Sequence, residues 1–498
     1  MLFTSLRTRL KAQLTAGLLA GLCSLGAVAQ PSLQALPPEV ATLLTRAKVP
    51  PDALAVLVVD AAPTLNGPSA PLLSWRADAA MNPASVMKLV TTYAGLELLG
   101  PSFTWATPVY VDGSVAGGVL QGNLVIQGRG DPKLVQERLW LLLRRVQGLG
   151  IQSITGDILL DRSAFAASTQ NAADFDGEPQ RPYNVVPDAL LLNFKSVAMT
   201  FTPNPGNGSA SVSFEPPLAR VQMQTRVPLL AGANGSASLA ACGDYRAQLK
   251  ADFSDPYRMA FNGSYPVACG EKVWAVAYAD PASYAERAVA GMWQEMGGQL
   301  GGRVREGRAA PGQTPAFEMA SPPLAEVIRD INKFSNNVMA QQLFLTLGQA
   351  SGVPPDGGAS LEASRAVVAH WWRERMGGQA QPVLDNGSGL SRQARITSQG
   401  LGRLLQTAYV SGAMPELMAS LPISGVDGTL RHSKSGVSQG GAHLKTGSLR
   451  DATALAGYVH SPTGRRLVLV AIVNHPNANA ARPALVALVE WAVKQGSR

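Results

Sequence analysis

A change of hydrophobic pattern along the chain limits its fold more than any other feature. Residues from about 107 to 310 form short β-rich runs broken by Gly, Asn and Pro, at 124–127, 158–160 and 211–214, with one helical segment at 132–149. On both sides, apolar residues recur at the spacing typical of helices packed on a core. The 498 residues also exceed the length at which a single hydrophobic core usually stops growing. We therefore predict an α/β domain built from both chain ends, 30–106 plus 311–498, with a mostly β insert at 107–310 of one or two subdomains.

The two outer segments combine strands with helices. A β-branched run at 54–60 predicts a strand, and a loop rich in Pro, Gly and Asn leads from it to a second strand. Helices are predicted from near Ser85 to near Gly100 and over 324–345, 361–376 and 482–494. Two strands are predicted at 454–460 and 466–474, joined by a turn at 461–464.

The first 29 residues have the pattern of a secretory signal peptide. Arg7, Arg9 and Lys11 precede a Leu/Ala/Gly stretch that ends in Ala27-Val28-Ala29. A membrane-spanning helix is the alternative, but Gly, Thr and Ser residues interrupt the stretch, and nothing later in the sequence approaches the ~20 apolar residues that a span needs. We therefore expect export with cleavage after Ala29, a periplasmic location and no transmembrane segment in the mature protein.

The cysteine content and the net charge limit which kinds of functional site the chain can contain. Cleavage leaves Cys242 and Cys269, which we expect to form a disulfide in an oxidising compartment, two buried free thiols being the alternative. The sequence has no CxxC or HExxH spacing, so it does not indicate a metal site. The net charge is +8, but the basic residues are scattered rather than clustered beside aromatic residues, which argues against nucleic-acid binding.

Ser85 and Lys88 open the first strong helix, in the run Ser85-Val86-Met87-Lys88. Residues three apart on a helix lie on the same face, so a nucleophile and a candidate base would be adjacent. The alternative is that Ser85 only caps the helix while Lys88 is solvated. The surrounding apolar residues favour a partly buried Lys88, and burial would lower its pKa toward the range in which a lysine can act as a base.

Two further polar patterns follow in the last third of the chain. Ser335-Asn336-Asn337 lies in the stretch predicted as helix 324–345 and could present a hydroxyl and an amide to a cleft, or form a solvated turn. Lys445-Thr446-Gly447-Ser448 precedes the last strand pair and could direct a cation and hydroxyls at a carboxylate, with Gly447 allowing a ligand to come close. A second K-[ST]-G pattern begins at Lys434 but has no apolar strand around it.

The order S-x-x-K, S-x-N, K-T-G is the motif set of penicillin-binding proteins and class A β-lactamases. With these motifs, the sequence resembles the D-alanyl-D-alanine carboxypeptidase/endopeptidase family, the low-molecular-mass class C penicillin-binding proteins. Similar runs occur at 130–132, 183–193, 387–392 (GSGLSR), 425–430 (GVDGTL), 445–449 (KTGSL) and 456–459 (AGYV). The separation of Ser85 and Ser335 leaves room for the family's large insert, which an ordinary class A β-lactamase lacks.

The resemblance implies a fold, a reaction and a set of roles. The fold would be an α/β (α+β) transpeptidase domain with a five-stranded antiparallel sheet flanked by helices, and no cofactor would be needed. The substrates would be peptidoglycan stem peptides ending in D-Ala-D-Ala, and β-lactams would acylate the same serine. Ser85 would be the nucleophile, Lys88 its base, Ser335 the proton relay to the leaving amine and Asn337 a ligand of the substrate amide. Lys445 and Thr446 would hold the terminal carboxylate beside Gly447, and the N–H groups of Ser85 and Ser448 would form the oxyanion hole.

Three other interpretations stay open at this point. Gly436-Val437-Ser438-Gln439-Gly440 fits the G-x-S-x-G pattern of another class of serine hydrolase, although that pattern needs a strand before it and a helix after it. The chain could instead be a non-catalytic module that binds the wall or senses β-lactams. A β-lactamase is the third, but no Glu-x-x-Leu-Asn loop lies between Asn337 and Lys445 to supply a deacylation base.

Overall fold

The computed structural model describes residues 35–62, 70–230, 241–349, 358–433 and 436–496. The predicted signal peptide and the second K-[ST]-G pattern at Lys434 lie outside the described residues. Within them, no helix is both long and apolar enough to cross a membrane.

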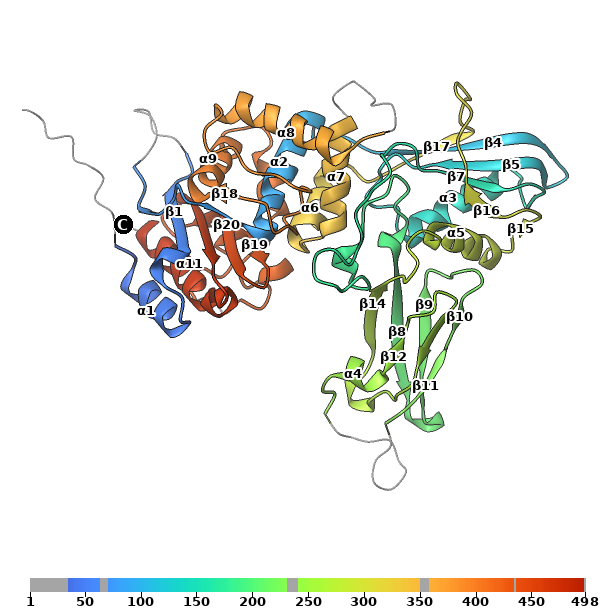
Figure 1. Ribbon diagram of the computed structural model, residues 1–498, viewed down its shortest axis with the longest axis horizontal. Coiled ribbons are helices and arrows are strands. Elements are labelled where there is room, and N and C mark those ends of the chain that lie inside the picture. The colour runs from blue at the N-terminus through green and yellow to red at the C-terminus, as the bar shows by residue number, and fades with distance from the viewer. Residues whose placement is uncertain (1–34, 63–69, 231–240, 350–357, 434–435, 497–498) are drawn as a thin grey trace, which may run out of the picture. The chain divides into compact units, whose positions relative to one another are not determined.

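A five-stranded antiparallel sheet joins the two ends of the chain (Figure 1). Its strands, in spatial order, are β19 (Ala442–Ser448), β20 (Ala452–His460), β21 (Arg466–Asn474), β1 (Leu54–Asp60) and β2 (Leu73–Trp75). The two long neighbours β1 and β21 pair along the whole of β1, from Leu54 opposite Val473 to Asp60 opposite Leu467. The predicted antiparallel sheet, including the two terminal strands, is therefore confirmed.

Both faces of this sheet are covered by helices, which explains the nearly continuous apolar sequence of β1. Leu54, Val56 and Val58 pack in a cluster with α1 (Pro38–Arg46) and α11 (Arg482–Gly496). The alternate residues Leu57 and Val59 belong to a cluster on the other face. That cluster is formed with α2 (Lys88–Leu99), α6 (Leu324–Lys333), α7 (Asn337–Gln349), α8 (Leu361–Met376), α9 (Ser398–Tyr409) and α10 (Met414–Ser420).

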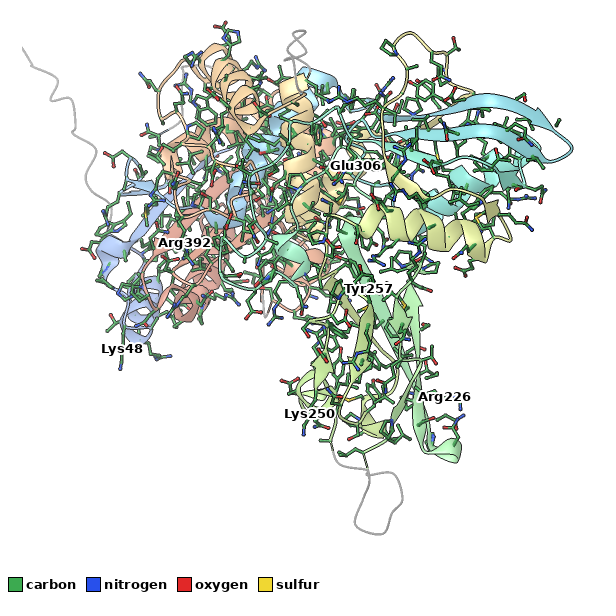
Figure 2. All side chains as sticks on the ribbon, turned by 45° about the vertical axis from the view of Figure 1, so that its right-hand side comes forward. Lys48, Arg226, Lys250, Tyr257, Glu306 and Arg392 are labelled. Carbon is green, nitrogen blue, oxygen red and sulfur yellow. A yellow bond between two sulfur atoms is a disulfide. The ribbon has the colours of Figure 1, made fainter. Side chains whose placement is uncertain are left out.

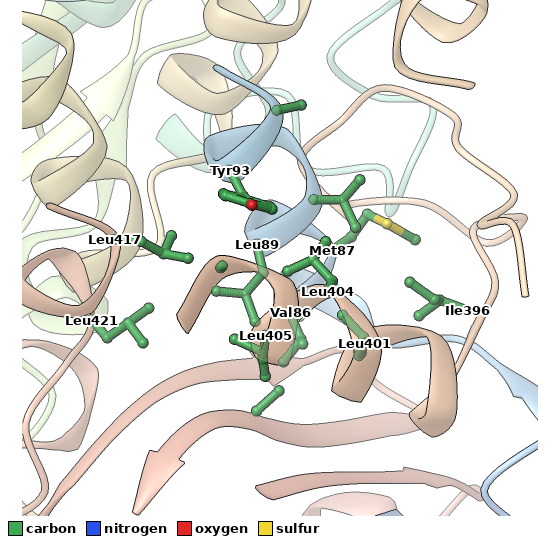
Figure 3. Close-up of a cluster of buried hydrophobic side chains, with 14 of the residues drawn as sticks. Val86, Met87, Leu89, Tyr93, Ile396, Leu401, Leu404, Leu405, Leu417 and Leu421 are labelled. Carbon is green, nitrogen blue, oxygen red and sulfur yellow. The ribbon is translucent and has the colours of Figure 1, made fainter. Parts of the chain in front are cut away.

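Helix α2 lies in the middle of the second cluster (Figure 3). Leu89 and Tyr93 of α2 pack near Leu401, Leu404 and Leu405 of α9 and near the leucines of α10 and of the segment that follows it. A short 3-10 turn, η2 (Ala84–Met87), leads into α2, whose C-cap is Gly100. The predicted helix from near Ser85 to near Gly100 is thus confirmed.

The single helix predicted over 324–345 is wrong, because the chain breaks between α6 and α7. Ser335 has a φ of 57°, in the left-handed region that no helix interior can accommodate. The Asn336 side chain then caps α7 by accepting a hydrogen bond from the Met339 N–H at 3.1 Å. Ser and Asn side chains compete for backbone hydrogen bonds and so favour caps over helix interiors. The apolar spacing on both sides concealed this break.

The middle of the chain forms sheets of its own. A seven-stranded sheet contains β4 (Ala106–Ala116), β5 (Val119–Gln127), β6 (Ser153–Ile154), β7 (Ile158–Asp161), β15 (Gln299–Leu300), β16 (Val304–Glu306) and β17 (Phe317–Ala320), with α3 (Gln136–Gly148) and α5 (Tyr284–Glu295). A four-stranded sheet contains β8 (Ser196–Asn204), β9 (Ser209–Glu215), β11 (Arg226–Pro228) and β14 (Lys272–Ala277). A three-stranded sheet contains β10 (Gln222–Met223), β13 (Arg258–Phe261) and β12 (Ala251–Asp252), and a short helix, α4 (Tyr245–Leu249), precedes β12. Outside the middle of the chain, β3 (Ala80–Met81) pairs with β18 (Ile396–Thr397). The division of the chain at 106 and 311 stays a prediction.

The predicted disulfide between Cys242 and Cys269 is confirmed. It belongs to the same stretch of chain as Arg226, Lys250 and Tyr257, whose side chains are labelled in Figure 2. Arg392, also labelled there, belongs to the α/β part that carries the three motifs.

Candidate active site

Ser85 lies in a tightly packed turn at the entrance to α2. From Met81 to Leu96 it is the only residue that is not buried. The preceding residue, Ala84, has a φ of 49°, an unfavourable value for a residue with a Cβ. Strain of this kind persists only where the surroundings fix the backbone, so the turn is built to present one hydroxyl.

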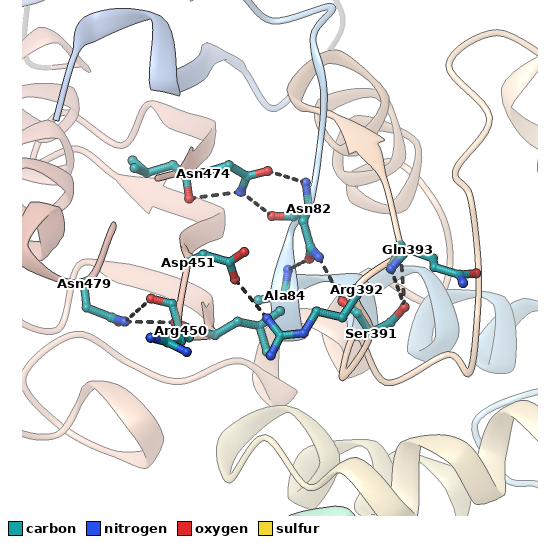
Figure 4. A network of polar contacts seen from close by, with 12 residues as sticks. Asn82, Ala84, Ser391, Arg392, Gln393, Arg450, Asp451, Asn474 and Asn479 are labelled. Carbon is teal, nitrogen blue, oxygen red and sulfur yellow. Dashed lines mark hydrogen bonds and ion pairs between the residues drawn. The ribbon is translucent and has the colours of Figure 1, made fainter. Parts of the chain in front are cut away.

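Two asparagines hold this turn in place (Figure 4). Asn82 accepts a hydrogen bond from the Ala84 N–H at 2.9 Å and donates one to the Ser391 carbonyl at 2.9 Å. Asn474, at the end of β21, accepts from the Asn82 N–H at 2.8 Å and donates to its carbonyl at 2.9 Å. The turn is thereby tied to the central sheet and to the GSGLSR loop.

Lys88 is fully buried and reaches three oxygen atoms. Its Nζ lies 3.0 Å from Ser85 Oγ, 2.7 Å from Asn337 Oδ1 and 2.7 Å from the Ser388 carbonyl oxygen. Ser388 lies in the GSGLSR loop, which the hydrogen bonds of Asn386 to Ser388 hold in a compact turn. The structure thus brings Ser85, Lys88 and Asn337 together from segments that are far apart in sequence.

The second lysine of the site, Lys445, lies on the edge strand β19 and makes a similar set of contacts. It is also fully buried, and its Nζ donates to Ser335 Oγ at 2.9 Å and to the Thr446 carbonyl at 2.9 Å. Thr446 Oγ1 lies 2.8 Å from Thr429 Oγ1, in the GVDGTL loop. That loop is anchored to the end of α6 by an ion pair of 2.6 Å between Lys333 and Asp427.

Gly447 allows β19 to lie directly against the Ser85 turn. A Cβ at this position would be 2.5 Å from the Pro83 carbonyl oxygen and 3.2 Å from the Ser85 nitrogen. We expected Gly447 to make room for a ligand, whereas the close approach is that of the Pro83–Ser85 backbone. At Gly447, β19 consequently passes directly beside the backbone nitrogen of Ser85.

Burial of two neighbouring ammonium groups sets the electrostatics of the site. Desolvation, and secondarily the charge of Lys445, hold the pKa of Lys88 well below its usual range. Burial lowers the pKa of Lys445 to about 7. Both effects on Lys88 favour its neutral amine, the form that can accept a proton.

The side chain of Asn337 forms hydrogen bonds to two partners from different parts of the chain. Its Oδ1 accepts from Lys88, and its Nδ2 donates to the Tyr183 carbonyl at 3.1 Å, in the insert. The side chain is 7% exposed. In this structure Asn337 orients Lys88 and links the insert to α7, and its predicted role as a ligand of the substrate amide stays a prediction.

Ser438, the candidate nucleophile of the alternative G-x-S-x-G pattern, is hydrogen-bonded to a carboxylate away from this cluster. It is 1% exposed, and its hydroxyl donates to the Glu490 carboxylate at 2.5 Å, while the Ser438 and Val437 N–H groups donate to the same carboxylate. Ser438 is followed by a turn and by β19, not by the helix that a nucleophile elbow requires. Ser438 therefore fixes a loop to α11.

A cavity of about 1040 Å³ is lined by residues between Leu160 and Arg308 and is separate from this cluster. Arg162, Asp188 and Lys195 are among the charged residues that line it, and none of the motif residues does. Asp188 accepts from both Arg162 and Lys195, so these charges are already paired. This cavity therefore does not coincide with the residues that the three motifs bring together.

Three residues that build the site were not predicted from the sequence: Asn82, Ser388 and Asn474. Ser388 contributes through a backbone carbonyl, which has no side-chain signature. Its only signal was the GSGLSR run with its closely spaced glycines. Asn82 and Asn474 act by fixing the backbone of the Ser85 turn, and their partners become evident only once β21 is placed beside it.

Comparisons with known proteins identify the family and the fold of this chain. Residues 37–495 match the D-Ala-D-Ala carboxypeptidase 3 (S13) family. The chain is 24% identical over 399 residues to the D-alanyl-D-alanine carboxypeptidase DacB of Haemophilus influenzae, covering 78% of this chain and 80% of that protein. It is 27% identical over 442 residues to the D-alanyl-D-alanine carboxypeptidase of Actinomadura sp., covering 83% and 78%. The crystal structure of penicillin-binding protein 4 from Haemophilus influenzae in complex with a β-lactam has the same fold, with a TM-score of 0.68, 22% identity and coverage of 92% of this chain and 99% of that one.

Proposed function

This chain belongs to the D-Ala-D-Ala carboxypeptidase 3 (S13) family, and we propose that it cleaves the terminal D-Ala-D-Ala bond of peptidoglycan stem peptides through an acyl-enzyme on Ser85. The protein is a serine-type D-Ala-D-Ala carboxypeptidase. Opening a peptide cross-link uses the same site, so D,D-endopeptidase activity belongs to the same proposal. β-Lactams would acylate the same serine, in keeping with the β-lactam complex of the Haemophilus influenzae structure.

The observation that carries this proposal is the set of partners of Lys88. A neutral amine has two hydrogens and one lone pair. Asn337 Oδ1 and the Ser388 carbonyl can only accept hydrogen bonds, and each lies 2.7 Å from Nζ. Both hydrogens would therefore point at these two oxygens, which leaves the lone pair facing Ser85 Oγ at 3.0 Å. In this arrangement Lys88 accepts the Ser85 proton while Oγ attacks the scissile carbonyl carbon.

Collapse of the tetrahedral intermediate breaks the C–N bond and leaves the acyl group on Ser85. Ser335, hydrogen-bonded to Lys445, would relay the proton that Lys88 has accepted to the leaving amine of the terminal D-Ala, so that both side chains return to their starting protonation states. Lys445 and Thr446 would bind the terminal carboxylate, and the N–H groups of Ser85 and Ser448 would stabilise the oxyanion. Water then hydrolyses the ester, releasing the shortened peptide and restoring the Ser85 hydroxyl.

The proposal also places this protein outside the cytoplasm. The pattern of residues 1–29 is that of a secretory signal, and the Cys242–Cys269 disulfide is of a kind that persists in oxidising compartments. These features support a periplasmic enzyme that meets peptidoglycan directly.

The proposal is tested by the rate at which a fluorescent penicillin labels three variants. Ser85→Ala should remove labelling, and Lys88→Ala should slow it by roughly 10²- to 10⁴-fold, the usual contribution of a general base. Ser438→Ala is the matched control and should label at the wild-type rate, because its hydroxyl binds Glu490. Release of D-Ala from a peptide ending in D-Ala-D-Ala should follow the same order. Normal labelling of a folded Lys88→Ala variant would overturn the assigned base.

A further inference from the structure

Arg482, the first residue of α11, reaches the last residue of β19. Its Nη2 donates to Ser448 Oγ at 3.1 Å and to Asn479 Oδ1 at 3.0 Å. The Asn479 amide donates in turn to the carbonyls of Leu449 at 2.9 Å and Arg450 at 3.3 Å (Figure 4). Arg482, Asn479 and the turn after β19 thus form one hydrogen-bonded unit at the end of the K-T-G strand.

This contact directs the hydroxyl of Ser448. A serine hydroxyl has one hydrogen and two acceptor positions, and a guanidinium can only donate. The Arg482 bond occupies an acceptor position, so the Ser448 hydrogen has to point toward another group. Ser448 and Thr446 are two residues apart on a strand, which places their side chains on the same side of the sheet. Both hydroxyls can therefore donate to one oxygen ligand when Thr446 accepts the hydrogen bond from Thr429.

Arg482 also differs from the two lysines of the site in its exposure to solvent. Lys88 and Lys445 are fully buried neighbours, and burial lowers the pKa of each. Arg482 is exposed, and its guanidinium lies at the surface beside the end of β19. Asp451, the acidic residue of the adjacent turn, pairs with Arg392 at 3.5 Å.

We propose that Arg482 is a positioning residue that acts through Ser448 to select substrates with a free terminal carboxylate. The inference rests on the proposed function, because the carboxylate it concerns is that of the terminal D-Ala. Arg482 orients the Ser448 hydroxyl toward the carboxylate and supplies a positive charge next to it.

The test compares two peptides ending in D-Ala-D-Ala, one with a free carboxylate and one with a terminal amide. For Arg482→Gln we expect KM for the free acid to rise about three- to tenfold, the range for an exposed charge-assisted contact, with little change in kcat. The amide should show no comparable rise. Arg482→Lys should restore part of the lost affinity because it keeps the charge without the fixed fork.

Arg450→Gln is the matched control. It removes one positive charge from the same turn but leaves the contact to Ser448, since only the Arg450 carbonyl binds Asn479. The inference is overturned if Arg482→Gln raises KM equally for both peptides, if Arg450→Gln has the same effect, or if KM for the free acid does not change. Penicillin labelling of Ser85 is measured in the same samples. Its absence in the wild-type protein would refute the proposed function, whereas normal labelling with no carboxylate selectivity would refute only the role of Arg482.

Discussion

Replacement of Lys445 by Met should make the protein more stable at neutral pH while disabling it. Lys445 is fully buried, and burial lowers its pKa from an ordinary 10.5 to about 7. At 1.36 kcal/mol for each pKa unit, confining this charged group costs the folded state about 5 kcal/mol at pH values below 7. Methionine has a similar length and carries no charge, so it escapes this cost.

The substitution also removes two hydrogen bonds, which reduces the gain. Lys445 Nζ donates to Ser335 Oγ and to the Thr446 carbonyl, each at 2.9 Å. A buried acceptor left without a partner costs about 1 to 3 kcal/mol. Ser335 is partly exposed, so water can replace the lysine there. We therefore expect a net stabilisation of about 2 to 4 kcal/mol below pH 7.

The sign of the pH dependence separates this explanation from a simple packing effect. Between pH 7 and 10.5 the unfolded chain still binds a proton on Lys445, whereas the folded chain has released it. The free energy of unfolding of the wild-type protein therefore rises with pH across this window. The variant lacks this contribution, so its advantage should be largest below pH 7 and should disappear toward pH 10.

Urea unfolding at pH 6, 8 and 10 measures the difference, and penicillin acylation measures the loss of function. Acylation should fall because the substrate carboxylate loses a partner and because Lys88, freed of a neighbouring charge, regains part of its ordinary pKa. A Lys445→Met variant that is less stable than wild type at pH 6, or whose difference from wild type is the same at pH 6 and pH 10, would refute the reasoning.

Two further predictions test the site and the insert. Gly447→Ala should slow acylation by at least tenfold and destabilise the protein by about 1 to 3 kcal/mol, because the new Cβ would lie 2.5 Å from the Pro83 carbonyl oxygen and force β19 away from Ser85. The control is Gly441→Ala, on the approach to the same strand, where the nearest atom would be 3.4 Å away; equal acylation rates in the two variants would contradict the packing argument. Replacing Cys242 and Cys269 by Ser should lower the free energy of unfolding by about 3 to 4 kcal/mol, as expected for a loop closed across a sequence separation of 27 residues, while penicillin acylation continues at the wild-type rate. Loss of acylation in a folded double variant would show that the insert takes part in the chemistry.

The sequence predicts the parts of this protein whose signals are local. β1 has an unbroken apolar run because both of its faces are buried. The terminal strands and α11 were likewise predicted from the local pattern of their apolar residues. The motif residues were identifiable because they occur in a recognisable order, and the structure brings Ser85 and Lys88 into contact with each other and Lys445 into contact with Ser335.

Features that depend on packing between distant segments could not be predicted in this way. The break at Ser335 was concealed because apolar residues continue at helical spacing on both sides of it. The Ser388 carbonyl beside Lys88 carries no residue signature, and Arg482 lies 34 residues from Ser448, so their contact depends on where α11 packs. The pKa of Lys88 likewise depends on burial, which the sequence only suggested.

Identification of the acylated residue tests the central claim most directly. The wild-type protein is incubated with benzylpenicillin, digested, and analysed by tandem mass spectrometry. We predict a single adduct with the mass of the intact drug, on the peptide that contains Ser85 and at the Ser85 side chain. An adduct on a peptide containing Ser335 or Ser438, or a folded protein that forms no adduct at all, would contradict the claim that Ser85 is the nucleophile.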